Sequence, residues 1–308
     1  MATWLITGGC GFIGSHLADA LLARGDRVRI VDNLATGRRE QVDKRCEIIV
    51  ADITEDGVMT RVMEGVDGCW HLAAVVSVPL CNEQWVASHA INMTGTVRVL
   101  DAARRVGGVN PIPVVYASSA AVYGDNQAVP LGETSATRPM TPYGADKLGS
   151  ELHARVAGLV HGIPTTGLRF FNVYGPRQDP SSHYSGVISI FIRRILDNAP
   201  LTVYDDGSQT RDFVYVGDVV RFLIRAMELA TTQAPVFNVC TGRQITILDL
   251  AATLFRVCGG KVEIRHAPPR SGDIRLSLGD PEAAAHALGL RTQTTLEEGL
   301  RQTVAFQK

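Results

Sequence analysis

A tyrosine and a lysine stand four residues apart in the segment Tyr143-Gly144-Ala145-Asp146-Lys147. If this segment is helical, the phenol and the ammonium group lie one turn apart on the same face. A tyrosine ordinarily has a pKa of roughly 10, and a neighbouring positive charge favours the phenolate and lowers that value. Tyr143 is therefore a candidate proton acceptor near neutral pH. The alternative is that both side chains lie on an exposed helix face without a chemical role.

Ser119 follows a strand predicted at Pro113–Ala117 and precedes the tyrosine in the chain. In open α/β sheets, ligands bind at the carboxyl ends of the strands. A serine hydroxyl at such an end can donate a hydrogen bond to a substrate hydroxyl or ketone. Two serines at a strand end also form ordinary turns, so Ser119 has to be judged together with the other motifs.

A glycine-rich segment, Gly8–Gly14, follows a strand predicted at Thr3–Thr7 and precedes a predicted helix. Read from Gly9, it has the pattern G-x-G-x-x-G. Glycines allow a tight turn and a close backbone approach to a pyrophosphate, and the helix N-terminus offers N–H donors to it. Glycines also form ordinary turns, which is the alternative for this segment alone.

The next predicted strand, Arg27–Val31, ends in Asp32, at the spacing expected for a carboxylate that accepts the ribose hydroxyls of NAD. Asp32 would repel a 2′-phosphate, which favours NAD over NADP. Arg38 and Arg39 follow closely and either soften that preference or lie solvated in a loop. Asp52 ends another predicted strand, where it either reaches the adenine or caps a following helix.

The elements that must position these residues alternate between short apolar strands and helical segments in the first half of the chain. This alternation predicts an α/β fold with a doubly wound parallel sheet. We predict an NAD-binding domain at residues 1–171, with return crossings near 210–240. Residues 172–308 are predicted to form a smaller α/β domain that binds the substrate.

The chain has 308 residues and a formal net charge of −1, which argues against a nucleic-acid-binding surface as its main function. No stretch approaches the roughly 20 apolar residues of a membrane span, and the N-terminus lacks the basic region of a secretory signal. The 6 cysteines are scattered without a C-x-x-C pair, which favours reduced thiols in the cytoplasm over disulfides or a zinc site. We therefore expect a cytoplasmic protein without a metal.

Taken together, the motifs resemble the extended short-chain dehydrogenase/reductase superfamily, which has a Rossmann-type sheet. Within it, the chain is similar to the UDP-glucose/UDP-N-acetylglucosamine 4-epimerase family over almost its whole length. The matching segments are Thr7–Ser15, Asp32-Asn33-Leu34, His71-Leu72-Ala73-Ala74, Asn92–Thr96, Ala117–Gly124, Pro142–Lys147, Leu168–Asn172 and Arg211-Asp212-Phe213. The resemblance implies that Ser119, Tyr143 and Lys147 are the catalytic residues.

The same resemblance assigns a set of NAD contacts, which comprises Gly8, Gly11, Phe12, Ile13, Asp32, Asn33, Asp52, Ile53, Leu72, Ala73, Ala74, Asn92, Tyr143, Lys147 and Phe170. Phe170 stands where the family commonly has a tyrosine, so a hydroxyl is lost and an aromatic face is kept. The substrate contacts implied are Ser77, Ser119, Tyr143, Asn172, Val187, Thr202, Val203, Tyr204, Arg211, Arg270, Asp273 and Ser277. Arg211 and Arg270 resemble a diphosphate clamp, although a surface ion pair is the more ordinary role for either.

One departure separates this chain from neighbouring reactions. The related sugar-nucleotide dehydratases and UDP-glucuronate decarboxylases carry acidic residues after the strand-end position. Here Ser119 is followed by Ala120 and Ala121, which can neither donate nor accept a proton. Elimination of water would therefore lack its acid and base.

By similarity to the family, Ser277 occupies the gate beside the C2 substituent of the sugar. A small residue there leaves room for an N-acetyl group, so we expect UDP-GlcNAc and UDP-GalNAc as substrates, with UDP-glucose and UDP-galactose also considered. The reaction implied is an inversion at C4 through a transient 4-keto sugar. Alternatives are another nucleotide-sugar epimerase, such as a UDP-glucuronate 4-epimerase, and a non-catalytic NAD-binding regulator.

The predicted helices Trp85–Arg105 and Tyr143–His161 carry more apolar positions than one sheet face requires. In related proteins the equivalent helices form a four-helix bundle between subunits. We therefore expect a homodimer, with a UDP-sugar as ligand and with neither nucleic acid nor a membrane as partner.

Overall fold

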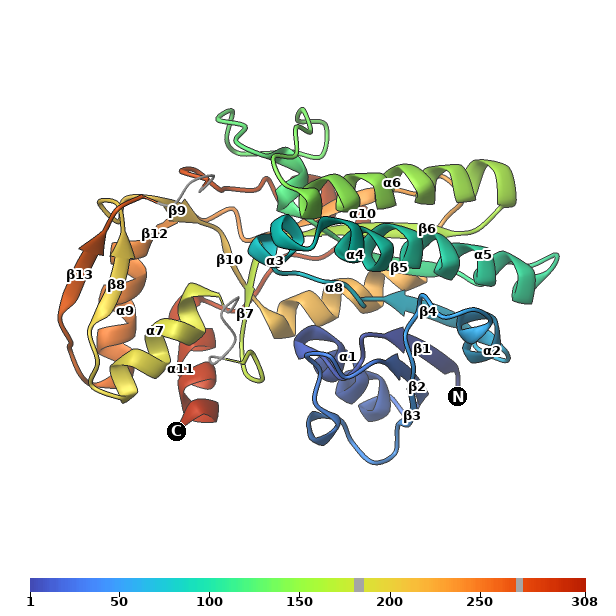
Figure 1. Ribbon diagram of the computed structural model, residues 1–308, viewed down its shortest axis with the longest axis horizontal. Helices are drawn as coiled ribbons and strands as arrows, with labels where there is room; N and C mark the ends of the chain where they lie inside the picture. Colours follow the sequence, from blue (N-terminus) through green and yellow to red (C-terminus); the bar gives the residue numbers. More distant parts are fainter. Residues whose placement is uncertain (180–185, 270–273) are drawn as a thin grey trace. The chain divides into compact units, whose positions relative to one another are not determined.

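The computed structural model describes residues 1–179, 186–269 and 274–308 (Figure 1). Contacts between residues divide the chain into two compact units. The first unit comprises Met1–Val122, Thr141–Arg169 and Val220–Phe237. The second comprises Tyr123–Met140, Phe170–Val219 and Asn238–Lys308. The chain therefore passes between the units several times.

A seven-stranded sheet has the order β11-β6-β5-β4-β1-β2-β3. In chain order its strands are β1 (Thr3–Thr7), β2 (Arg27–Asp32), β3 (Glu47–Val50), β4 (Gly68–His71), β5 (Val114–Ser119), β6 (Thr165–Phe170) and β11 (Val236–Val239). The pairs β1–β2, β1–β4, β2–β3 and β4–β5 are parallel. The predicted doubly wound parallel sheet is thereby confirmed. The strand order reverses direction between β1 and β4, which is where such sheets bind dinucleotides.

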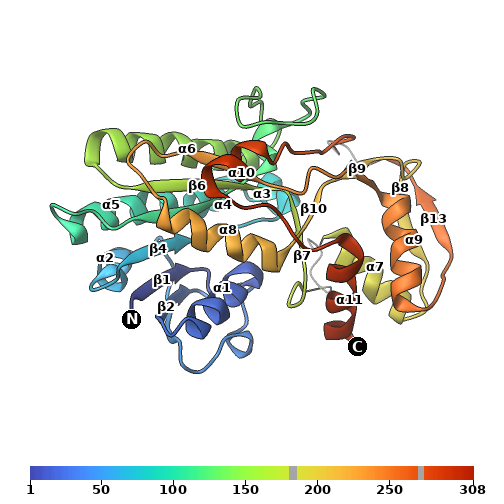
Figure 2. The ribbon, with the colours of Figure 1, turned by 180° about the vertical axis from the view of Figure 1, so that it is seen from behind.

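Helices cover both faces of this sheet (Figures 1 and 2). The helices of this part of the chain are α1 (Phe12–Ala23), α2 (Val58–Met63), α3 (Val78–Glu83), α4 (Trp85–His89), α5 (Gly95–Gly107), α6 (Pro142–His161) and α8 (Val216–Glu228). Three short turns lie between these elements: η1 (Arg39–Gln41), the π-helical turn η2 (Ala90–Thr94) and η3 (Ala120–Tyr123). Because side chains alternate along a strand, Cys69 and its neighbour Trp70 of β4 serve opposite faces. Cys69 belongs to the buried cluster that includes α2 and α5, whereas Trp70 Nε1 donates a hydrogen bond to Leu223 O of α8 at 2.9 Å.

The second unit contains three two-stranded pairings and four helices in the part of the chain that is described. The strands are β7 (Asn172–Tyr174), β8 (Leu201–Tyr204), β9 (Thr210–Arg211), β10 (Phe213–Tyr215), β12 (Ile245–Thr246) and β13 (Ile264–Ala267), paired as β10–β7, β12–β9 and β13–β8. The helices are α7 (Val187–Leu196), α9 (Ile247–Cys258), α10 (Glu282–Leu288) and α11 (Leu296–Gln307). Ile192, Leu254 and Leu300 join one buried cluster, so α7, α9 and α11 share a core.

The predicted single helix at 85–105 is interrupted in the structure. One wider turn, η2, separates α4 from α5, and such turns accommodate an extra residue in an α-helix. Within the described ranges, no helix combines the length and apolar character that crossing a bilayer requires.

Candidate active site

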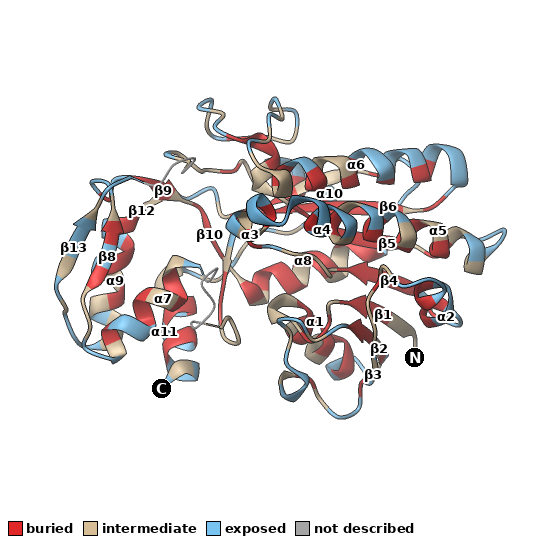
Figure 3. Ribbon diagram, viewed as in Figure 1, coloured by how far each residue is buried: buried red, intermediate tan, exposed pale blue. Residues whose placement is uncertain are grey.

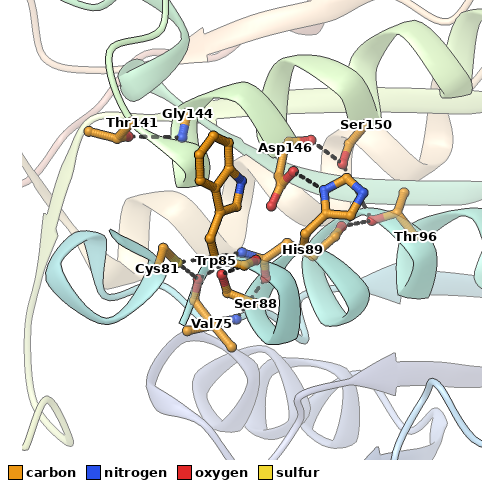
Figure 4. A network of polar contacts seen from close by, with 11 residues as sticks. Val75, Cys81, Trp85, Ser88, His89, Thr96, Thr141, Gly144, Asp146 and Ser150 are labelled. Atoms are coloured by element: carbon orange, nitrogen blue, oxygen red, sulfur yellow. Dashed lines mark hydrogen bonds and ion pairs between the residues drawn. The ribbon is translucent and has the colours of Figure 1, made fainter. Parts of the chain in front are cut away.

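The start of α6 places the tyrosine and the lysine of the first motif. Thr141 caps this helix because its side chain accepts a hydrogen bond from Gly144 N at 3.1 Å (Figure 4). Tyr143 therefore lies in the first turn and Lys147 one turn later, with Lys147 Nζ 5.8 Å from the centroid of the Tyr143 ring. Lys147 Nζ also donates a hydrogen bond to Ala117 O of β5 at 2.8 Å. The ammonium group thus joins α6 to the strand that ends in Ser119.

Ser119 is the last residue of β5, and its Oγ accepts a hydrogen bond from Ala121 N at 3.2 Å. This bond holds the turn that follows the strand. A hydrogen bond with the Ser119 side chain also lowers the pKa of Tyr143. The structure therefore brings together the three residues that the sequence predicted as catalytic, all within the first unit.

Burial dominates the ionisation of this site when only the residues of the chain are considered. Burial raises the pKa of Tyr143 to about 12 and outweighs the lowering by Ser119. Burial also lowers the pKa of Lys147 to about 8, which Asp146 partly opposes. The expected lowering of the tyrosine pKa is therefore not produced by the chain alone, because removal of water from the phenolate is the larger effect.

The glycine-rich segment is shaped for close approach to a ligand. A Cβ on Gly8, whose φ is +70°, would lie 2.8 Å from the Cα of Ala73, and one on Gly14 would lie 2.4 Å from Gly8 O. No described side chain caps the first turn of α1, which begins after Gly11. The first backbone N–H groups of this helix and its dipole therefore remain for an anion. Phe12 and Ile13 form this first turn, so these residues fit the pyrophosphate of a dinucleotide.

Asp32 ends β2, beside the glycine-rich segment. Its Oδ2 accepts a hydrogen bond from Cys10 N at 2.9 Å, and its Oδ1 accepts one from Leu34 N at 2.8 Å. Each carboxylate oxygen can accept more than one hydrogen bond, so the same group can also receive ribose hydroxyls. This placement fits the predicted ribose contact.

Asp52 and Ile53, which were predicted to contact the adenine, lie just after β3. Asp52 Oδ1 accepts a hydrogen bond from Thr54 N at 2.8 Å, and its Oδ2 accepts one from Asn33 Nδ2 at 2.8 Å. The carboxylate therefore caps a turn, and α2 begins later, after Gly57. The Ile53 side chain is 4% exposed and belongs to the core cluster. Ile53 can therefore offer a ligand little beyond its backbone, because its apolar side chain is used in packing.

A buried histidine connects the ends of β1 and β4. Thr7 Oγ1 accepts hydrogen bonds from Leu72 N and Ala73 N, and it lies 2.8 Å from His71 Nδ1. Since the threonine oxygen already accepts two bonds, its own proton points to Nδ1, which leaves the histidine proton on Nε2. Nε2 then donates to Thr96 Oγ1 at 3.0 Å. Burial, with a smaller effect of Lys147, lowers the pKa of His71 to about 3, so the ring is neutral.

The chain after β4 is held by a side chain instead of a strand. Asn92 Oδ1 accepts a hydrogen bond from Val75 N at 2.8 Å, and Asn92 Nδ2 donates to Val75 O at 3.0 Å. Asn92 thus fixes the segment that contains Ala74, in addition to its predicted role at the cofactor. Ser77 ends this segment, where its Oγ caps α3 by accepting a hydrogen bond from Leu80 N at 3.1 Å.

The remaining predicted residues lie in the second unit. Phe170 is buried at the end of β6, and Arg211 Nη1 donates to Ile274 O at 2.6 Å. The predicted residues at element positions are Asn172, first in β7, Val187, first in α7, and Thr202, Val203 and Tyr204 of β8. The Val203 side chain is fully buried in the core, so Val203 can offer a ligand only its backbone, whereas strand alternation leaves the Thr202 side chain exposed.

Ser277 is half-buried between two anchored residues. Thr210 N donates a hydrogen bond to Arg275 O, and Leu131 N donates one to Leu278 O, both at 2.9 Å. The segment around the predicted gate is therefore held by backbone bonds on either side. Arg270 and Asp273, predicted for the diphosphate and the ribose, lie outside the described residues.

The motifs gave no sign of a buried ion pair beneath the strand-end serines. Arg169 of β6 donates two hydrogen bonds to Glu151 of α6, from Nε at 2.9 Å and from Nη2 at 2.7 Å. Ser118 Oγ donates to Glu151 Oε1 at 2.5 Å. Glu151 lies four residues after Lys147, so the helical spacing in the sequence could have placed it on the same face. This group connects β5, β6 and α6 below the candidate catalytic residues.

Comparisons with known proteins identify the family and support the fold. Residues 4–240 match the model of the NAD dependent epimerase/dehydratase family. UDP-glucose 4-epimerase of Thermotoga maritima, solved with UDP-glucose, has a TM-score of 0.94 and 35% identity and covers 99% of this chain and 98% of its own. UDP-glucose 4-epimerase of Thermus thermophilus, in complex with NAD, has a TM-score of 0.91 and 36% identity, with coverage of 99% and 98%.

Relatives with other substrates match as well. UDP-N-acetylglucosamine 4-epimerase of Methanobrevibacter ruminantium M1, in complex with UDP-N-acetylmuramic acid, has a TM-score of 0.94 and 33% identity and covers 99% of this chain and 97% of its own. UDP-glucuronic acid decarboxylase 1 of Danio rerio is 32% identical over 312 residues, which are 98% of this chain and 72% of that protein. The family match extends over most of the chain, and this protein belongs to the NAD dependent epimerase/dehydratase family.

Proposed function

We propose that this protein is an NAD-dependent UDP-sugar 4-epimerase. The observation that carries the proposal is the convergence of Ser119, Tyr143 and Lys147 at one sheet edge, beside a glycine-rich turn that fits a dinucleotide. The two alanines after Ser119, Ala120 and Ala121, lack the proton donors and acceptors that dehydration requires. The pattern therefore favours epimerisation over the other reactions of the family.

In the proposed mechanism, the Tyr143 oxygen accepts the proton of the sugar O4 hydroxyl. Ser119 positions the sugar O4 atom by a hydrogen bond. Bound NAD supplies a hydride acceptor and the positive charge of its oxidised ring. Lys147 contributes a second positive charge, which stabilises the phenolate against the burial that raises the pKa of Tyr143 to about 12. Because the sugar is oxidised and then reduced at the same carbon, no outside oxidant is consumed.

For the substrate, we propose UDP-GlcNAc and UDP-GalNAc, with UDP-glucose and UDP-galactose also accepted. Support comes from the small side chain of Ser277, which the backbone bonds of Arg275 and Leu278 hold in place. The likeness to both UDP-glucose and UDP-N-acetylglucosamine 4-epimerases is consistent with this range. In a Ser277→Tyr variant, we expect turnover of the N-acetylated pair to fall selectively. An equal loss on both sugar classes would count against a gate at this position.

A homodimer is proposed from an exposed apolar face on α6. Leu152, Val156, Leu159 and Val160 are all exposed on this helix, and the last three follow Leu152 by four, seven and eight residues. Figure 3 shows exposed segments recurring along α6. These spacings place them on one side of the helix. A second copy of the chain is the proposed occupant, because a two-fold contact would pair this face with itself.

The proposed activity is tested by incubating the purified protein with UDP-GalNAc, UDP-galactose or UDP-glucuronate without added NAD. We expect conversion of UDP-GalNAc and UDP-galactose to their C4 epimers by cofactor that remains bound during purification. A Tyr143→Phe variant should lose about 10²- to 10⁴-fold in turnover, as expected for removal of an acid–base group. Tyr215→Phe is the matched control, since its hydroxyl donates to Gln302 Oε1 at 2.6 Å within the second unit, outside the candidate catalytic residues.

The alternatives predict different outcomes in this assay. Conversion of UDP-glucuronate alone would favour the UDP-glucuronate 4-epimerase alternative. Absence of conversion of all three sugars, even with NAD supplied, would support a non-catalytic NAD-binding protein. Full activity of the Tyr143→Phe variant would refute the proposed proton transfer.

A further inference from the structure

Helix α6 is joined to the end of β5 by two hydrogen bonds from residues one turn apart. Lys147 Nζ donates to Ala117 O at 2.8 Å, and Glu151 Oε1 accepts from Ser118 Oγ at 2.5 Å. Ala117 and Ser118 are the two residues before Ser119 in the strand. Because residues spaced by four lie on one face of a helix, the face of α6 that carries the candidate catalytic residues also carries Glu151.

The Glu151 carboxylate is held in one orientation by a buried arginine. Arg169 of β6 donates to Oε1 from Nε at 2.9 Å and to Oε2 from Nη2 at 2.7 Å. A bidentate pair of this kind fixes the plane of the carboxylate as well as its position. Glu151 is 8% exposed and Arg169 is 6% exposed, so little water competes for these bonds. Oε1 is therefore presented to Ser118 in a fixed place.

Stability alone is a weak reason for a buried ion pair at this position. Removing two charges from water is costly, and apolar residues of similar volume often give equal or greater stability. This pair, however, joins the helix that carries Tyr143 to the strand that ends in Ser119. Since these two groups come from different elements, their separation depends on how α6 lies against β5.

Other polar contacts of α6 lead away from β5. His89 Nδ1 on α4 donates to Asp146 Oδ1 at 2.6 Å, which fixes α6 relative to another helix (Figure 4). Ser150 Oγ donates to Asp146 O of its own helix at 2.9 Å and lies 3.4 Å from Thr96 Oγ1 of α5. Ser150 is therefore a buried serine next to Glu151 whose contacts do not reach the strand.

We propose that Glu151 is a positioning residue: through Ser118 it holds α6 against the end of β5 and so sets the distance between Tyr143 and Ser119. Arg169 keeps the carboxylate in the orientation that this requires. Misplacement of a reacting group by about 1 Å can cost a factor of about 10² in rate, so a small shift of α6 affects turnover. The inference rests on the proposed function for its effect on turnover, whereas the placement of α6 can be tested without it.

The direct test is Ser118→Ala, which removes the hydrogen bond to Glu151 and leaves the ion pair with Arg169. We expect kcat for the UDP-sugar to fall by about 10- to 100-fold. The KM should stay close to wild type, because the residues that bind the nucleotide are unchanged, and such a split indicates a loss in the transition state. Ser118→Thr retains the hydroxyl and should restore most of the activity.

Ser150→Ala is the matched control, since it also removes a buried serine hydroxyl that donates a hydrogen bond. Its kcat should remain close to wild type. Equal losses of kcat in Ser118→Ala and Ser150→Ala overturn the proposal, as does a loss in Ser118→Ala that Ser118→Thr does not restore. If Ser118→Ala does not fold, Arg169→Lys decides the question, because lysine keeps the charge and lacks the fork that orients the carboxylate. A wild-type kcat in that variant overturns the proposal.

Crystal structures of the wild-type protein and Ser118→Ala give a readout that does not depend on activity. When the strands β4 and β5 are superposed, the Tyr143 oxygen should move relative to Ser119 Oγ by more than about 0.5 Å, the tolerance of a productive site. An unchanged separation overturns the proposal. If the wild-type protein epimerises no UDP-sugar, the proposed function fails, and this comparison still tests the role of Glu151.

Discussion

The close contact between the turns after β1 and β4 predicts a strong effect of Gly8→Ala. An alanine at a φ of +70° costs about 1–2 kcal/mol by itself. Its Cβ would also lie 2.8 Å from the Cα and N of Ala73, both backbone atoms that cannot rotate away. Overpacking of this kind adds about 1–3 kcal/mol. The two turns must therefore separate at the place where the dinucleotide is proposed to bind.

Gly65 is a matched control for this substitution. Its φ is also +70°, but a Cβ there meets nothing within 4 Å. Gly65→Ala should therefore show the backbone cost alone. With an unfolding entropy of about 2.1 cal/mol/K per residue, 1 kcal/mol corresponds to about 1.5 °C in Tm for 308 residues.

We expect Tm to fall by about 2–3 °C in Gly65→Ala and by about 3–8 °C in Gly8→Ala, in proportion to these costs. The measurements are scanning calorimetry and the NAD content of the purified protein after acid release. The amount of bound NAD per protein should be lower than wild type in Gly8→Ala and equal to wild type in Gly65→Ala. If both variants have the same Tm and the same NAD content, the contact with Ala73 does not shape the cofactor site.

Three further outcomes follow from buried and exposed groups described above. Because the pKa of His71 is lowered from 6.5 to about 3, the unfolded state takes up a proton that the folded state does not. The contribution of neutral His71 to the free energy of unfolding is complete above pH 6.5 and is lost as the pH falls toward 3. Urea unfolding should therefore show that the free energy of unfolding falls by about 1 kcal/mol between pH 6.5 and 5.5, and this loss should be absent in His71→Gln. Glu151→Gln leaves the Arg169 guanidinium buried without its carboxylate and should cost about 3–5 kcal/mol in the same assay, whereas Glu297→Gln in an exposed pair should change little. Leu159→Glu should convert a dimer to a monomer in light scattering, and a wild-type monomer at micromolar concentration would refute the proposed interface.

Much of the sheet could be predicted because apolar residues recur along its strands and helices with the spacing typical of each element. Strand Thr3–Thr7 begins and ends where the pattern predicts, and the strand predicted at Arg27–Val31 and the helix predicted at Tyr143–His161 each differ by one residue at one end. The short strands of the second unit are only two to four residues long, which is too short for alternation to be read. Helix α11 was missed although Thr295 caps it by accepting a hydrogen bond from Glu298 N. Its Thr-x-x-Glu spacing is a recognisable start signal.

In the candidate site, too, some residues could be predicted from local sequence and others could not. Residues in motifs, such as Ser119 and Tyr143, could be found because their chemistry depends on local spacing. The pairing of His89 with Asp146 depends on packing between residues 57 positions apart, which no local pattern encodes. Likewise, the raised pKa of Tyr143 follows from burial, which depends on the whole fold.

The two hydrogen bonds between the Asn92 side chain and the Val75 backbone fix the chain after β4 independently of the sheet. The Asn92 carboxamide offers Val75 one donor and one acceptor, as a peptide unit of a neighbouring strand would. Val75, which follows β4, thus makes the two hydrogen bonds that a neighbouring strand would provide, although it is not part of the sheet. The position of Val75 therefore depends on the Asn92 side chain, whereas the register of β4 is set by its own pairing with β1 and β5.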